Sequence, residues 1–237
     1  MRRAIPLFLV LLGAGAGCRA TGFYLDNPAN PIQGVRKFAV APVESPETAD
    51  PLKLGEILAS ELVQFPGAEV IRPADVVAAA RKNGLVLTDE RSLRALGRIL
   101  KADAVLVAAI TESKTYYPPR LAVAAQLFFV GGGPSGTRSA IDLSLEGRAG
   151  GARPVTLLDR GELIQIEKVY DGSHRETRDL AAYYARGHYT NKEAIDGADR
   201  VLRLPDFYFR FVSNRLVRDI FADWQARQVL AKENTRK

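Results

Sequence analysis

This chain of 237 residues is poor in the residue types that most often do chemistry: it has two histidines, His174 and His188, and one cysteine, Cys18. Both histidines stand in polar sequence, and neither is spaced from a second ligand as in the His-Glu-x-x-His motif of zinc enzymes. Gly-x-Ser-x-Gly and Cys-x-x-Cys motifs are absent, and no serine near either histidine is expected at a strand-to-helix turn. We therefore predict solvated surface histidines, no catalytic residue, no bound metal and no cofactor.

The glycine-rich segment 131–136 does not have the pattern of a phosphate-binding loop. No Gly-Lys-Ser/Thr sequence follows it, and it stands between two runs of alternating sequence rather than before a helix. It is typical of a hairpin tip. Adjacent carboxylates such as Asp89 and Glu90 indicate a helix cap rather than an acid–base pair.

The N-terminus has the three parts of a secretory signal: basic residues at 1–3, an apolar run at 4–12 and small residues at 13–17. The apolar run is shorter than the ~20 residues that a membrane-spanning helix needs. Residues 15–18, Gly-Ala-Gly-Cys, resemble the lipobox of bacterial lipoproteins. This resemblance implies that residues 1–17 are a signal peptide and that Cys18 carries the lipid (palmitate and related acyl chains). The alternative is an ordinary signal with an incidental cysteine.

The lipobox resemblance also implies a location. Arg19 follows Cys18, and by likeness to enteric sorting rules a residue other than Asp there implies the outer membrane, with the protein facing the periplasm. Residues 18–34 predict a lipidated tether, because Gly and Pro recur there without apolar periodicity. Residues 35–230 predict one envelope domain, and residues 231–237 a charged tail.

Composition fits a globular domain, with 47% hydrophobic and 25% charged residues. The formal charge of +6 becomes +4 when Arg2 and Arg3 leave with the signal (6 − 2 = 4). This excess is small and scattered, so no nucleic-acid partner is expected.

Apolar periodicity predicts an α/β (α+β) fold. A mixed sheet of about five to six strands is expected, in the order β-α-β-α-α-β followed by an antiparallel meander, with flanking helices and a C-terminal helix. The predicted strands are 35–43, 68–71, 103–111, 121–130, 141–146 and 162–170, and the predicted helices are 54–65, 74–82, 89–101 and 205–228. The inner face of the last helix is expected at Phe209, Val212, Leu216, Ile220 and Trp224.

Two segments are rich in tyrosine and arginine, which are common in recognition surfaces. The first joins two predicted strands at residues 116–120 and is either a structural turn or a binding ledge. The second surrounds residues 175–186 and is either a partner-binding helix or a solvated one. The predicted partner-binding residues are Tyr116, Tyr117, Arg120, Arg175, Arg178, Tyr183, Tyr184 and Arg186. The aromatic run 207–211 is expected mainly in the core.

The strand at 38–43 and the helix-to-strand element Leu-Lys-Ala-Asp-Ala-Val-Leu-Val at 100–107 resemble a group of bacterial envelope proteins. The group includes the curli-secretion protein CsgG, the peptidoglycan-synthase activator LpoB and the N-terminal domain of TolB. The resemblance spans residues 35–170 and implies an anticodon-binding-domain-like fold.

The resemblance also implies a protein that is anchored to the membrane by its lipid and docks an envelope protein or peptidoglycan. One alternative is an oligomeric secretion-channel component, with the chain as a homo-oligomer. The one candidate hairpin, 121–147, fits a channel poorly because Asp142 and Glu146 lie in its second strand. The other alternative is an enzyme that acts on peptidoglycan or another glycan, but we expect no enzymatic activity.

Overall fold

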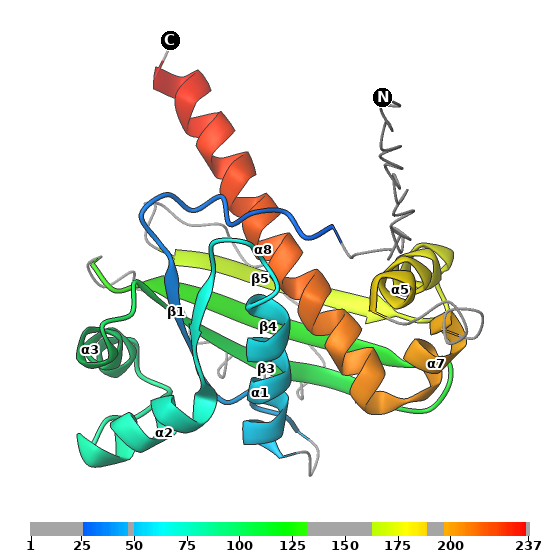
Figure 1. Cartoon of the computed structure of the whole chain (residues 1–237), viewed down its shortest axis with the longest axis horizontal. Helices are drawn as coiled ribbons and strands as arrows, with labels where there is room; N and C mark the ends of the chain where they lie inside the picture. Colours follow the sequence, from blue (N-terminus) through cyan, green and yellow to red (C-terminus); the bar gives the residue numbers. More distant parts are fainter. Residues whose placement is uncertain (1–25, 47–49, 132–162, 189–196, 236–237) are drawn as a thin grey trace, which may run out of the picture.

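Five strands form one mixed sheet in the order β2-β1-β3-β4-β5 in the computed structural model, which describes residues 26–46, 50–131, 163–188 and 197–235 (Figure 1). β1 is parallel to β2 and to β3, whereas β4 is antiparallel to both β3 and β5. The predicted fold class is therefore confirmed. The strands are β1 (Lys37–Val40), β2 (Glu69–Ile71), β3 (Ala104–Lys114), β4 (Arg120–Phe129) and β5 (Leu163–Asp171).

Six helices are described: α1 (Pro51–Leu62), α2 (Pro73–Lys82), α3 (Glu90–Leu100), α5 (Arg175–His188), α7 (Gly197–Arg203) and α8 (Pro205–Thr235). The first three helices begin at residues that stabilise a helix N-terminus. Asp50 caps α1, Pro73 is the first residue of α2, and Asp89 caps α3 by accepting from the Ser92 N–H. Asp89 is thus the helix cap that the sequence indicated.

The sheet has a different helical layer on each face. Side chains alternate along a strand, so Leu106 of β3 and Leu127 of β4 point to the layer that contains α1 and α8. Val105 and Phe128 point the other way, into a smaller cluster with α2 and α3. Figure 1 shows α8 crossing the first face.

Helix α8 anchors the first face. Phe209, Val212, Leu216 and Ile220 are buried, as predicted, and Trp224 packs on Phe129 with ring centroids 5.4 Å apart. The helix runs to Thr235, so it includes most of the segment 231–237 that the sequence suggested as a charged tail. Among the residues described, no helix combines the length and the apolar character that crossing a membrane requires.

The segment at 26–34 is not a free tether. Asn27 is 9% exposed and Ile32 is 3% exposed, because this segment lies against the domain. The Asn30 N–H donates to the Pro66 carbonyl at 2.9 Å, which fixes the segment beside the end of α1. The prediction of a tether is therefore wrong for these residues. The signal peptide 1–17, Cys18, nearly all of segment 131–136 and the predicted strand 141–146 lie outside the described residues.

Candidate functional site

Three connections meet at one end of the sheet and form what we call the loop-end surface, residues 114–120, 171–175 and 203–206. The Gly172 N–H donates to the Pro119 carbonyl at 2.7 Å, and a Cβ at Gly172 would lie 2.8 Å from the Pro119 Cδ. The guanidinium of Arg203 lies over the Tyr117 ring, 5.0 Å from its centroid. Figure 1 shows α5 and α7 at this end. The structure therefore places the 116–120 loop next to the start of α5, which contains the second tyrosine- and arginine-rich segment.

Large aromatic and apolar side chains are exposed on the loop-end surface. Tyr116 is 75% exposed, Tyr117 49% and Leu204 42%. A single exposed apolar residue is unremarkable on a protein surface, but neighbouring ones mark recognition sites. Tyrosine is well suited to this role, because it offers a large apolar ring and a hydrogen-bonding hydroxyl.

A cavity of about 110 Å³ opens in the loop-end surface. This is comparable with the ~150 Å³ cavity that accepts a benzene ring in another protein. Its polar rim contains Lys114 and Asp206, and Asp206 is paired with Lys53 at 2.7 Å. The remaining lining is mostly apolar: Leu54, Ile110, Pro119, Leu121, Pro205, Tyr208 and Phe209, with Ser45, Ser113 and Thr115. The cavity suits one apolar side chain.

Arg120 has a structural role beside this surface. Its guanidinium lies 3.3 Å from Glu112 of β3 and 3.9 Å from Asp171 of β5, so it ties three strands together. Ser173 lies next to His174 at the strand-to-helix turn between β5 and α5, so the expectation that no serine near a histidine stands at such a turn is wrong. Its hydroxyl and N–H both donate to Asp171, which lowers the pKa of that carboxyl. The Ser173 hydroxyl is therefore engaged in the turn, and His174 is exposed.

Most of the predicted residues of α5 lie on its outer side. Arg175, Arg178, Tyr183 and Arg186 are exposed, and Arg175 pairs with Asp179 at 3.7 Å. Tyr184, in contrast, is only 2% exposed, so its assignment to a partner-binding surface is wrong. The inner stripe of α5 consists of residues 181, 184, 185 and 188, a helical spacing that places Tyr184 toward the core.

A buried polar group that the sequence did not single out lies beneath α5; we call it the Glu61 cluster, which consists of Glu61, Tyr184, His188, Arg210 and Asn214. The Tyr184 hydroxyl donates to Glu61 at 2.8 Å, and the Asn214 amide donates to it at 3.3 Å. Arg210 lies 3.8 Å away. Burial raises the pKa of Glu61 to about 7, against the lowering effect of these partners.

His188 belongs to this cluster, so its prediction as a solvated histidine is wrong. Its ring stacks on Tyr184 with centroids 4.0 Å apart, and its Nε2 lies 3.0 Å from the Gln64 side-chain oxygen and 3.7 Å from Glu61. Burial lowers the pKa of His188, which favours the neutral ring. A Glu–His pair can serve in catalysis, but Glu61 has a side chain that is 1% exposed and lines neither cavity described here.

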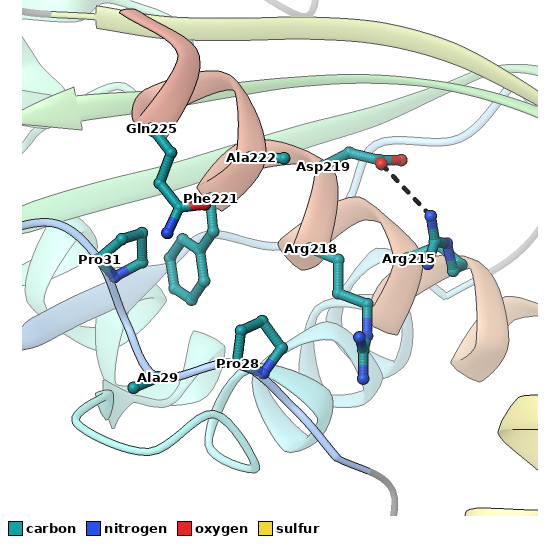
Figure 2. A pocket seen from close by; sticks show the side chains of 9 residues that line it. All are labelled: Pro28, Ala29, Pro31, Arg215, Arg218, Asp219, Phe221, Ala222 and Gln225. Carbon is teal, nitrogen blue, oxygen red and sulfur yellow. Dashed lines mark ion pairs between the residues drawn. The ribbon is translucent and has the colours of Figure 1, made fainter. Parts of the chain in front are cut away.

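A second cavity, of about 260 Å³, lies where the segment 26–34 crosses α8 (Figure 2). Pro28, Pro31 and Phe221 form its apolar side, and Arg215 and Arg218 lie on the other side (Figure 2). These two guanidinium groups are engaged by the protein: Arg215 lies 3.6 Å from the Asp219 carboxylate, whereas Arg218 donates to the Asp26 carbonyl at 2.7 Å and to Asn27 at 2.8 Å. The cavity is therefore a junction between the N-terminal segment and α8.

Within the described ranges, no three His, Cys, Asp or Glu side chains lie together as ligands of a metal ion would. No family model and no curated protein sequence matches the chain.

Solved structures are similar in fold. The LpoB C-terminal domain from Salmonella enterica matches with a TM-score of 0.37 and 17% identity, over 45% of this chain and 80% of that chain. Lipoprotein GNA1162 from Neisseria meningitidis matches with 0.36 and 19%, over 58% and 80%. The hypothetical protein CT253 from Chlamydia trachomatis matches with 0.35 and 16%, over 81% and 96%.

These likenesses, all below a TM-score of 0.5, assign no activity or partner to this chain. Two of them are to proteins named as LpoB and as a lipoprotein. The resemblance to CsgG and TolB stays a prediction.

Proposed function

We propose that this protein is a lipid-anchored binding protein of the bacterial cell envelope that docks another envelope protein through the loop-end surface. The observation that carries the proposal is the exposure of Tyr116 and Tyr117 beside a mostly apolar cavity. Exposed tyrosine side chains are typical anchors of protein interfaces, and an apolar pocket near them can accept an anchor of the partner. In this proposal the protein acts by contact and is not an enzyme.

The anchor is the second part of the proposal. The lipobox-like sequence before Cys18 supports lipidation, and Arg19 supports the outer membrane, with the domain facing the periplasm. Lipid chains hold a protein at a membrane surface because each buried methylene contributes ~0.8 kcal/mol. Docking would therefore take place close to that membrane.

Site-specific photo-crosslinking in cells tests the docking surface. The full chain carries p-benzoylphenylalanine in place of Tyr116, and the matched control carries it in place of Val86, which is 56% exposed on the connection between α2 and α3. We expect an envelope-protein adduct at position 116 that is absent at position 86. The replacement Leu121→Trp, which fills the cavity from β4, should reduce the adduct while circular dichroism shows a folded protein.

Other outcomes would contradict docking of an envelope protein at the loop-end surface. Equal adducts at both positions, or none at position 116, would overturn docking at this surface. An adduct of twice the mass of the chain would indicate a homo-oligomer, and one that muramidase digestion collapses would indicate peptidoglycan as the partner.

Metabolic labelling with palmitate tests the anchor. We expect the label on the wild-type chain and none on the Cys18→Ala variant. Label that persists in the variant would rule out lipidation at Cys18.

A further inference from the structure

Helix α5 packs mostly on α7, and it meets α1 through polar contacts of Tyr184 and His188. Its buried residues are Ala181, Tyr184 and Ala185, so the tyrosine provides the one large buried side chain among them. That ring packs edge-on against Phe211 of α8 at 5.8 Å, while its hydroxyl donates to Glu61 of α1. One carboxyl group, that of Glu61, therefore lies where α5 meets α1.

The groups that face Glu61 come from every element around it. From α5 these are Tyr184 and His188; from α8, Arg210 and Asn214. Just after the end of α1, Gln64 lies beside His188. From the N-terminal segment, Asn27 accepts from Asn214 at 3.4 Å and from Arg218 at 2.8 Å, with Asp26 next in sequence. The network thus joins four parts of the chain around one carboxyl.

An ionised Glu61 has no fully buried cation beside it within this network, since Arg218, which is half-buried, reaches it only through Asn214. Arg210 is the charged group beside it, but the Arg210 side chain is 44% exposed and its attraction is screened by water. His188 is favoured in its neutral form by burial. Burial of an ionised carboxylate costs free energy. Ionisation of Glu61 therefore favours conformations in which water reaches it.

We propose that the Glu61 cluster is a pH-sensitive latch, which holds α5 against α1 and α8 while Glu61 is neutral and lets α5 open more often once Glu61 is ionised.

The direction follows from linkage between proton binding and opening. In the closed state the pKa of Glu61 is about 7, whereas in an opened, hydrated state it returns toward the ordinary value of 4.5. Between these two values the open state binds fewer protons, so opening becomes more favourable as pH rises, by at most about tenfold per unit. The window of 7 − 4.5 = 2.5 units limits the total change to about 300-fold. Below pH 4.5 and above pH 7 the effect is flat.

The latch bears on docking, and this consequence alone rests on the proposed function. The outer side of α5 presents Arg178, Tyr183 and Arg186, and its first residue, Arg175, belongs to the loop-end surface. Opening of α5 would change how these side chains are placed beside Tyr116 and Tyr117. A partner that docks on this end would then bind differently on the two sides of the window.

Hydrogen exchange of the full chain between pH 4.5 and 8 tests the latch without any partner. Protection factors, which remove the intrinsic pH dependence of exchange, are compared for the amides of residues 181–188 and for α3 as an internal reference. We expect protection of α5 to fall, by up to about 300-fold, and protection of α3 to change far less. The Glu61→Gln variant should abolish the pH dependence, whereas the control Glu56→Gln, on the same helix but half-buried, should keep it.

Tyr184→Phe sharpens the test, because it keeps the ring and removes the hydroxyl that favours the ionised carboxylate. The pKa of Glu61 in the closed state should then rise further, so the fall in protection should continue to higher pH than in the wild type. Equal pH dependence in wild type and Glu61→Gln would overturn the latch. If Glu61→Gln does not fold, NMR titration of the Glu61 carboxyl in the wild type replaces it, and a midpoint near 4.5 would overturn the latch equally. Neither result depends on whether the loop-end surface docks a partner.

Discussion

The two faces of the sheet satisfy their buried polar groups in different ways. On the α2–α3 side, Arg94 pairs with Glu90 one turn earlier on α3 and also donates to the Phe129 carbonyl, and Gln126 bonds Gln165 on the adjacent strand at 3.0 Å. On the α1–α8 side, Glu61 draws its partners from two other helices. The buried polar groups of the first face thus find partners at most 39 residues away, whereas Glu61 on the second face requires segments that are 123 and 153 residues away.

The largest expected effect tests how much the second face depends on that assembly. Phe211 is fully buried and packs on both Tyr184 and Tyr208, so Phe211→Ala should lower the free energy of unfolding by about 3–5 kcal/mol. Leu96→Ala on the other face should lower it by about 2–5 kcal/mol. Urea unfolding measures both variants.

The two variants should differ in their effect on helix α5. Phe211→Ala removes the ring against which Tyr184 packs, so it should also reduce exchange protection of α5 beyond the global loss. Leu96→Ala should not. A loss below about 1 kcal/mol for Phe211→Ala, or the same α5 response in both variants, would contradict the distinction between the faces.

The next effect is the dependence of stability on pH. Burial raises the pKa of Glu61 to about 7, so its contribution to stability is complete below pH 4.5 and is lost as pH rises through 7. The difference between a pKa of 4.5 and one of about 7 corresponds to about 3 kcal/mol. His188 acts with the opposite sign, because its pKa is lowered and stability falls as pH drops below 6.5. Asp89 and Asp171 have lowered pKa values and act below about pH 4.

The difference between wild type and Glu61→Gln isolates the carboxyl from these other groups. Thermal or urea unfolding of both proteins at pH 4.5, 6 and 8 measures it. The wild type should lose stability relative to the variant as pH rises. A constant difference across this range would show that Glu61 keeps an ordinary pKa, and the contrast between the faces would then reduce to packing.

The distinction between local and distant pairs also explains how much the sequence predicted. β1, α2 and α3 were predicted within a few residues, because apolar periodicity and caps are local signals. β3 continues to Lys114, beyond the predicted end at residue 111, because its polar last residues pair with β4 across the turn. Exposure of Tyr116 followed from the proline-rich turn beside it.

The Glu61 cluster could not be predicted in the same way. Tyr184 and Asn214 are 123 and 153 residues away from Glu61 in sequence. A signal was nevertheless present: Glu61 interrupts the apolar stripe of α1, and Tyr184 with His188 continues the spacing of Ala181. A polar residue on an apolar stripe indicates a buried partner, but only the fold says which one.

A smaller effect concerns the place where the layers of the two faces meet. Gly55 of α1 faces the start of α2: a Cβ there would lie 2.9 Å from Pro73 Cγ, 3.0 Å from the Ala41 carbonyl oxygen and 3.1 Å from Pro42 Cα. Since two of these atoms are backbone, Gly55→Ala should cost about 1–3 kcal/mol. Urea unfolding checks this. Gly84→Ala is not a matched control, because Gly84 has a φ of +63° and strain would be added.

The smallest effect should not distinguish the faces at all. Asp50 caps α1 by accepting from the Leu52 and Lys53 N–H groups at 2.9 and 3.3 Å, so Asp50→Ala should cost about 1 kcal/mol. Asp50→Asn keeps a side-chain oxygen and should recover most of that loss. Asp89→Ala removes the equivalent cap of α3 on the other face and should destabilise in the same direction. Because a cap acts within one helical turn, urea unfolding should show similar losses for the two alanine variants. A much larger loss at Asp50 would mean that the start of α1 is coupled to the distant network around Glu61, and the division between local and long-range pairing would have to extend along the whole helix.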